Sequence, residues 1–194
     1  MIREVRTVVA GLTLAFTMAA AASAQAHKLS GALALSEEKG DVVTFVVAPD
    51  GERVVFLADL VTDEVFELWS VPSDQSAPPV RLNGTLVAGG DVLAFPRPRI
   101  TTTNVVVYAA DAAQDAYTGL YAVPIDGSST PLLLNQPLLD PYPSDFSFEL
   151  TQDWSRAIYR HYADDLYSVP LDGSTPPLLI STSCQNCYGS GFVS

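Results

Sequence analysis

Cysteine, histidine and methionine are scarce in this sequence, with two residues of each in a chain of 194. A zinc site with the usual four ligands would need every cysteine and histidine, yet His27 and His161 lie far in sequence from Cys184 and Cys187. The Gly-x-Ser-x-Gly motif of serine hydrolases does not occur, so the sequence supplies no such nucleophile for His161. We therefore expect no catalytic residues, cofactor or metal ion, and interpret His161 as a partly exposed strand or hairpin residue.

Basic residues are also few. The chain has 10 lysines and arginines against 22 aspartates and glutamates, which gives a formal net charge of −12. A phosphate backbone or an anionic lipid surface would repel such a chain, so nucleic acid is a poor partner. Hydrophobic residues make up 48% of the sequence, which is enough for one ordinary core or a short array of repeats.

Long apolar runs are missing except near the N-terminus. Arg3 and Arg6 precede an apolar run over residues 8–22, and small residues follow it, which is typical of an export signal. We interpret residues 1–26 as a signal peptide cleaved after Ala24 or Ala26, and we expect the mature chain in the periplasm or outside the cell. No later stretch has the length and apolarity of a membrane helix, so we expect no membrane insertion after cleavage.

One phrase occurs three times, at residues 68–75, 120–127 and 166–173. Each copy alternates apolar and aromatic residues, passes through Val-Pro and reaches an aspartate, as a half-buried strand that ends in a turn does. The prolines are separated by 52 and 46 residues, and periods of this size indicate the blades of a β-propeller. The residues that define the repeat are Trp69 and Pro72, Tyr121 and Pro124, and Tyr167 and Pro170.

Three further strand-like runs accompany each phrase, so the sequence predicts four antiparallel strands per unit. They are residues 42–47, 53–58 and 80–82 in the first unit, 92–95, 105–110 and 132–134 in the second, and 146–150, 156–161 and 178–180 in the third. We predict an all-β fold of antiparallel four-stranded blades, in which residues 27–194 form a partial, about three-bladed β-propeller. The predicted blades cover about residues 41–90, 91–144 and 145–190.

The connection between the first two predicted strands has the chemistry of a tight turn, because Asp50 and Gly51 tolerate positive φ. The second and third units depart from this sequence. In the second unit, residues 97–103 predict a longer loop, and the spacing aligns Phe95 with Phe45 of the first unit.

Both ends of the chain resemble parts of the repeated unit. Residues 28–33 resemble residues 81–86, a last strand, and residues 191–194 resemble a first strand. We expect either that the sequence is part of a longer or truncated propeller, or that these terminal strands pair with each other or with another copy. Uncovered strand edges and apolar blade faces also predict self-association.

Residues 48–56, Ala-Pro-Asp-Gly-Glu-Arg-Val-Val-Phe, followed by Leu-Trp-Ser-Val-Pro at residues 68–72, resemble the repeat of TolB-like, WD-repeat-related bacterial β-propeller proteins. The resemblance covers residues 29–194. It implies a periplasmic or secreted scaffold that binds a protein or a cell-envelope component, and it supplies no catalytic residues. Two alternatives stay open: the non-catalytic propeller portion of a larger hydrolase or peptidase, and a truncated remnant without independent activity.

Cys184 and Cys187 form a Cys-Gln-Asn-Cys sequence near the end of the chain. In an exported protein this spacing fits a local disulfide, a redox-active pair or half of a zinc site. The surrounding residues are rich in Ser, Asn and Gly and lack the βαβ pattern of thioredoxin-like proteins. We therefore favour a structural disulfide or plain thiols.

Carboxylates gather in the predicted hairpin loops of all three units. Calcium binding there and a carboxylate pair for glycoside hydrolysis are alternatives. Because the recurrence follows the repeat, we favour acidic loop tips that solvate the protein and discourage strand pairing. The residues are Asp59, Asp63 and Glu64, then Asp111 and Asp115, then Asp164 and Asp165.

Aromatic residues also follow the repeat. A ligand-binding ladder is one interpretation, and packing between neighbouring blades is the one we favour. The Asn83-Gly84-Thr85 sequence fits a glycosylation site, which we attribute to chance. The two aromatic columns are Trp69, Tyr121 and Tyr167, and Phe56, Tyr108 and Tyr159.

Overall fold

The computed structural model describes residue 29 and residues 40–135, 146–161 and 165–181. Within these ranges every regular element is a β-strand, which confirms the predicted all-β class. A search of the same ranges finds no helix that could span a membrane. The predicted signal peptide, Cys184 and Cys187, and the terminal partial strands apart from Leu29 lie outside the described residues.

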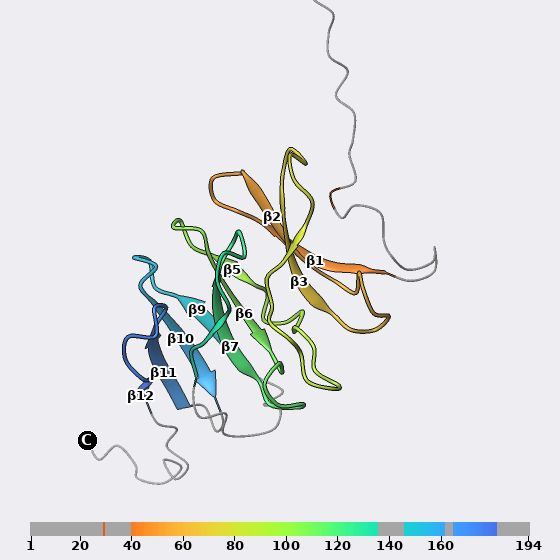
Figure 1. Ribbon diagram of the computed structural model, residues 1–194. Coiled ribbons are helices and arrows are strands. Elements are labelled where there is room, and N and C mark those ends of the chain that lie inside the picture. Colours follow the sequence, from red (N-terminus) through yellow and green to blue (C-terminus); the bar gives the residue numbers. More distant parts are fainter. Residues whose placement is uncertain (1–28, 30–39, 136–145, 162–164, 182–194) are drawn as a thin grey trace, which may run out of the picture.

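The described strands form three four-stranded antiparallel sheets, and each sheet is built from consecutive strands in sequential order (Figure 1). The first sheet contains β1 (Val42–Val47), β2 (Arg53–Ala58), β3 (Glu67–Pro72) and β4 (Val80–Arg81). The second contains β5 (Arg99–Ile100), β6 (Val105–Ala110), β7 (Gly119–Pro124) and β8 (Leu132–Leu133). The third contains β9 (Ser147–Leu150), β10 (Arg156–His161), β11 (Asp165–Pro170) and β12 (Leu178–Ser181).

The three sheets lie in a row, with the second between the first and the third (Figure 1). Successive side chains of a strand point to opposite faces, so one strand can contribute to two cores. In β6, Val106 and Tyr108 share a core with Val55 of the first sheet, whereas Val107 shares a core with Tyr159 of the third. The middle sheet is therefore covered on both faces.

The first strand of the second sheet begins later than the sequence predicts. A strand was expected at residues 92–95, but there only Val92 forms a bridge, to Ala110, and the ladder with β6 starts at Arg99. Two prolines stand between these points, and proline has no N–H group to donate to a ladder. The prediction of a strand at residues 92–95 is wrong for this reason.

The predicted alignment of Phe95 with Phe45 is also wrong. Phe45 pairs with Phe56 across β1 and β2. In the second sheet the register of Arg99 with Val107 places Pro98, and not Phe95, in the corresponding position. Phe95 is 76% exposed.

Candidate functional site

Each sheet is a meander, so its first and third connections lie at one end and its second connection lies at the opposite end. We call the first of these the turn end, because its connections are short. It contains residues 48–52, 73–79, 101–104, 125–131, 151–155 and 171–177. We call the opposite end the loop end, which contains residues 59–66, 82–98 and 111–118.

The first connection of each sheet is the same type of turn in three different sequences. The carbonyl of its first residue accepts a hydrogen bond from the N–H of its fourth, at 2.9, 3.1 and 2.9 Å in the three sheets. The fourth residues are Gly51, Asn104 and Trp154, with φ values of 77°, 62° and 58°. The prediction of a longer loop at residues 97–103 is wrong, because β5 begins at Arg99. The second and third units keep the turn, since Asn and Trp here adopt the left-handed conformation that Gly takes without strain.

The third connection repeats in the same way. Each of the repeat prolines ends a third strand, and its carbonyl accepts a hydrogen bond from the N–H three residues later, at 3.1, 2.9 and 3.1 Å. The donor residue has positive φ in all three sheets. Pro72 is followed by Gln75 with φ of 59°, Pro124 by Gly127 with φ of 68°, and Pro170 by Gly173 with φ of 65°.

Five exposed aspartates recur in these turns. Each accepts a hydrogen bond on Oδ1 from the backbone N–H two residues later, at distances from 2.9 to 3.2 Å. All five therefore lie at the turn end, and local hydrogen bonds fix their orientation. They are Asp50 and Asp153 in first connections, and Asp74, Asp126 and Asp172 in third connections.

Hydrogen bonding lowers the pKa of all five carboxyl groups, because it favours the charged form. The main donor is the N–H of Glu52 to Asp50, of Ser76 to Asp74 and of Ser174 to Asp172. The hydroxyl of Ser128 has the largest effect on the pKa of Asp126, and the hydroxyl of Thr151 on that of Asp153. The turn end thus carries five carboxylates that stay ionised more readily than ordinary aspartates.

Side-chain hydrogen bonds tie this end to the sheets. Asn104 Nδ2 donates to Asp50 Oδ2 at 3.0 Å, which joins the first turns of two neighbouring sheets. Arg53 Nε donates to Ser70 Oγ at 2.8 Å, and the third sheet repeats this contact between Arg156 and Ser168 at 2.6 Å. These contacts fix the turns relative to the sheets, while the five aspartates stay exposed to solvent.

Asp59 and Asp111 at the loop end have a structural role. They are 4% and 0% exposed. One carboxylate oxygen of each accepts a backbone N–H, from Asp41 and Asp91 respectively, and the other accepts the N–H five residues later, at 3.2 and 3.4 Å. The interpretation of all these carboxylates as solvated loop tips is wrong for Asp59 and Asp111, because they hold the loop backbone from inside.

The remaining loop-end carboxylates are less uniform. Glu64 and Asp115 are exposed. Burial raises the pKa of the Asp91 carboxyl, the N–H of Phe66 opposes this shift, and the nearby charges of Asp111 and Asp115 add to it.

Among the described residues, no group of three or more Cys, His, Asp or Glu could hold a metal ion. Calcium binding in the acidic loops stays the alternative that it was in the sequence, and Asp164 lies outside the described residues.

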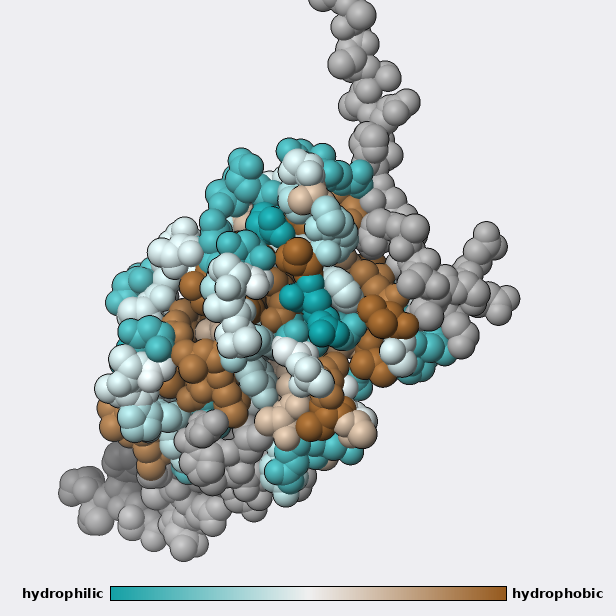
Figure 2. Space-filling model, viewed as in Figure 1, coloured by the Kyte–Doolittle hydropathy of each residue, from teal (hydrophilic) through white to brown (hydrophobic). Residues whose placement is uncertain are grey.

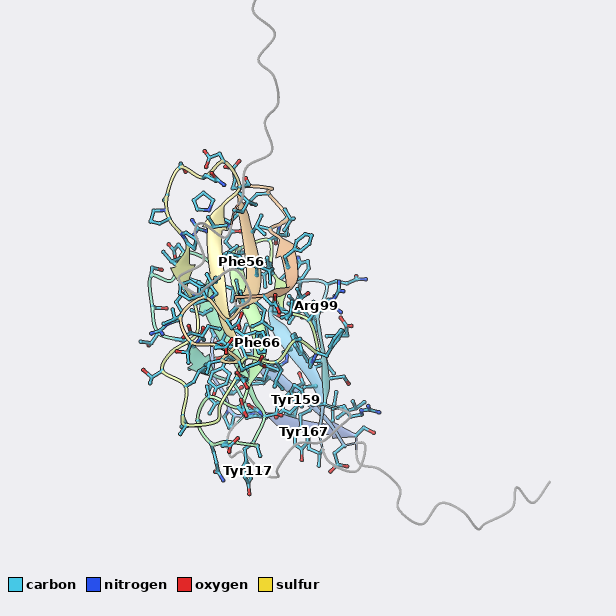
Figure 3. The ribbon with its side chains drawn as sticks, turned by 90° about the vertical axis from the view of Figure 1, so that its right-hand side faces the viewer. Phe56, Phe66, Arg99, Tyr117, Tyr159 and Tyr167 are labelled. Carbon is cyan, nitrogen blue, oxygen red and sulfur yellow. The ribbon has the colours of Figure 1, made fainter. Side chains whose placement is uncertain are left out.

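The two aromatic columns form cross-strand pairs. The rings of Tyr108 and Tyr121 stack with centroids 5.4 Å apart in the core between the first and second sheets. Tyr159 and Tyr167 stack at 5.3 Å, in the core between the second and third sheets. Figure 3 shows Phe56 near one end of the row of sheets and these last two tyrosines near the other. Phe56 pairs with Trp69 on the outer face of the first sheet.

Two asparagines complete strand ladders, a role that sequence reasoning missed. Asn83 Oδ1 accepts the N–H of Leu68 at 2.8 Å, and Asn135 Oδ1 accepts the N–H of Leu120 at 2.6 Å. Each asparagine directly follows a buried leucine after a fourth strand, and this Leu-Asn pair is the signal that could have revealed it. Asn83 is 4% exposed, so its amide is not accessible for glycosylation in the folded protein.

The other predicted residues do not extend the site. His161 ends β10, and its backbone pairs with Asp165. Trp69 Nε1 donates to the Ala58 carbonyl at 3.3 Å. Cys184 and Cys187, for which we favour a structural disulfide or plain thiols, lie outside the described residues.

No protein-family model matches the sequence, and no curated protein gives a significant match.

Proposed function

We propose that this chain is an exported, propeller-type scaffold that binds a protein or a cell-envelope component. Three consecutive four-stranded meanders support this proposal, because a propeller blade has the same strand order. The first strands of two neighbouring sheets, β1 and β5, lie side by side, as blades around a common axis require. The resemblance of residues 48–56 and 68–72 to TolB-like repeats agrees with this reading.

The binding surface we propose is the turn end, and the partner is a cationic polypeptide segment or an envelope component with cationic groups. The observation that carries this proposal is the array of five exposed aspartates in repeated turns. Fixed carboxylates of this kind speed association with a basic partner and select its orientation. The loop end is less suitable, because Asp59 and Asp111 are buried and used by the backbone.

A charge-matched pair of variants tests which end binds. The turn-end variant carries Asp74→Asn, Asp126→Asn and Asp172→Asn, which remove three charges while the amide oxygen can still accept the turn hydrogen bond. The control variant carries Asp63→Asn, Glu64→Gln and Asp115→Asn at the loop end. Both variants lose the same net charge, so a difference between them reports position.

Binding is measured by fluorescence anisotropy with a labelled lysine-rich peptide, and a glutamate-rich peptide of equal length is the negative probe. We expect the turn-end variant to bind the lysine-rich peptide roughly tenfold more weakly than the wild type, and the control variant to change it by less than about threefold. Equal losses in both variants would show an effect of net charge alone. That result, or no binding by the wild type, would overturn the proposal.

A further inference from the structure

The repeated register makes the surfaces of the three sheets directly comparable. Position by position along the ladders, Phe45 of β1 corresponds to Pro98 and to Phe148. Pro98 is buried, and Phe148 is 3% exposed in the core between the second and third sheets, but Phe45 is 61% exposed. Val47 is likewise 51% exposed. The outer face of the first sheet is thus an interior-type face without a covering sheet among the described residues.

The outer face of the third sheet is equivalent to the faces of the first and second sheets that pack on the next sheet in the row. Leu68 is 0% exposed in the core between the first and second sheets, and Leu120 is 0% exposed in the core between the second and third. Leu166 takes the same position in β11 but is only partly buried. Leu82 and Leu134 directly follow the residues that pair with the repeat aromatics in the first and second sheets, and they are 2% and 3% exposed. The equivalent residue of the third sheet is Ile180, which is 50% exposed. Brown surface lies at both ends of the row of sheets in Figure 2.

From this equivalence we propose that the outer face of the third sheet of one copy packs on the outer face of the first sheet of a second copy, head to tail. The chain already makes this contact twice internally, between its first and second and its second and third sheets. A second copy therefore supplies the kind of face that covers these positions elsewhere in the molecule. Such a heterologous contact uses two different surfaces, one from each copy.

The first-sheet face has the shape and chemistry for this partner. It contains a hollow of about 390 Å³ lined by Leu29, Val42, Phe45, Val47, Val54 and Phe56. Apolar side chains such as Ile180 and Leu166 of the second copy would fill it and be removed from water. Arg160 takes the position of Leu57 in the first sheet, so it would approach the Phe56–Trp69 pair, where a guanidinium can stack on an aromatic ring.

The turns of the third connections identify one residue pair in the proposed contact. A Cβ atom at Gly127 would lie 3.8 Å from Val80 Cγ2 of the preceding sheet, and one at Gly173 would lie 2.8 Å from Leu132 Cδ2. The residue equivalent to these glycines in the first sheet is Gln75, and the residue equivalent to Val80 and Leu132 in the third is Leu178. The proposal therefore places Gln75 of one copy beside Leu178 of the other.

Sedimentation velocity over a range of concentrations tests the association, with the chain purified after secretion by a bacterial host. We expect the wild type to self-associate and Val47→Glu to weaken association by at least about tenfold, because it places a charge in an apolar contact. Val61→Glu is the matched control, since Val61 is 56% exposed in the loop between β2 and β3 and does not belong to either strand ladder. We expect it to associate like the wild type.

Cross-linking tests the head-to-tail geometry. In a background with Cys184→Ser and Cys187→Ser, one protein carries Gln75→Cys and another carries Leu178→Cys, and a short bismaleimide is added to each alone and to the mixture. We expect a covalent dimer in the mixture and little in either protein alone. Circular dichroism of each variant confirms that it is folded.

Three results would overturn the proposal. They are a wild type that stays monomeric at all concentrations, association that Val47→Glu leaves unchanged, and cross-linking of the Gln75→Cys protein with itself, which would indicate a face-to-face dimer. A monomeric Val47→Cys variant whose thiol resists labelling would also contradict it, and would assign the face to another segment of the same chain. Gln75 lies at the turn end next to Asp74, so the peptide-binding test is made at protein concentrations below those at which the wild type associates, and its outcome is then independent of this one.

Discussion

At the scale of single residues, Asn135 shows how one buried side chain completes a strand ladder. Its Oδ1 accepts the N–H of Leu120, and its Nδ2 donates to the Thr118 carbonyl at 3.1 Å. Asn135 is 4% exposed, so neither backbone group has water as a substitute partner. The corresponding residue of the third sheet is Ser181, which is exposed at the end of β12.

We expect Asn135→Ala to lower the free energy of unfolding by about 1–3 kcal/mol, because it leaves the buried N–H of Leu120 without an acceptor. Ser181→Ala is the control, and we expect it to change the free energy by less than about 0.5 kcal/mol. Urea unfolding followed by circular dichroism measures both. Equal losses in the two variants would contradict the role of Asn135.

At the left-handed turn positions, the residue type predicts the backbone conformation in some sheets and not in others. Gly51 could be predicted, because Asp-Gly is a turn sequence. Trp154 could not, because the residue type opposes positive φ and the conformation is imposed by the ladder on both sides of the turn. The Thr151 hydroxyl accepts the N–H of Arg156, the first residue of β10, at 3.1 Å, and the Thr101 hydroxyl accepts the N–H of Val105, the first residue of β6, at 3.0 Å. A threonine at the first position was thus the available signal for this turn.

At the scale of elements, the turns couple stability to pH through their aspartates. The five turn-end carboxyls have lowered pKa values in the folded protein, while in the unfolded chain they return to about 3.8. Each therefore contributes stability that is fully present above the unfolded pKa and is lost as pH falls through the folded pKa. Asp91 has the opposite sign, because its pKa is raised.

We expect the urea midpoint of the wild type to fall below about pH 4 more steeply than that of the variant with Asp74→Asn, Asp126→Asn and Asp172→Asn. Asp91 is the same in both proteins, so its opposite contribution cancels in the comparison. The loop-end variant with Asp63→Asn, Glu64→Gln and Asp115→Asn controls for net charge. Parallel curves for the wild type and the turn-end variant would show that the turn hydrogen bonds do not set this pH dependence.

Most strands could be predicted from the sequence, and the exceptions have a local cause. The predicted limits of β2 and β6 match the structure, because their apolar runs are bounded by turn residues. The limits of β5 could not be predicted, since an apolar run at residues 92–95 competes with a two-residue strand after Pro98. The turn-end aspartates are visible in sequence, but their common end follows only from strand order.

At the scale of the whole molecule, the sheets differ in how completely they are covered. The middle sheet lies between two cores, and Val106, Val107 and Leu120 are 0% exposed. The first sheet is open at Phe45 and Val47, and the third is open along β12. Stability in a stacked array depends on the contacts that each unit makes with its neighbours, so opening the middle sheet requires the largest free energy.

We expect native-state hydrogen exchange to be slowest in β6 and β7, and faster in β1 and β12, because opening the middle sheet must break both inter-sheet cores. Mass spectrometry of peptic peptides from dilute protein measures this order. Raising the protein concentration should then slow exchange in β1 and β12 selectively, since the proposed contact covers these strands and leaves the middle sheet unchanged. In Val47→Glu this concentration dependence should disappear while the protection of β6 and β7 stays. Uniform protection across the three sheets would instead indicate a single cooperative unit, in which the outer faces are as well covered as the middle sheet.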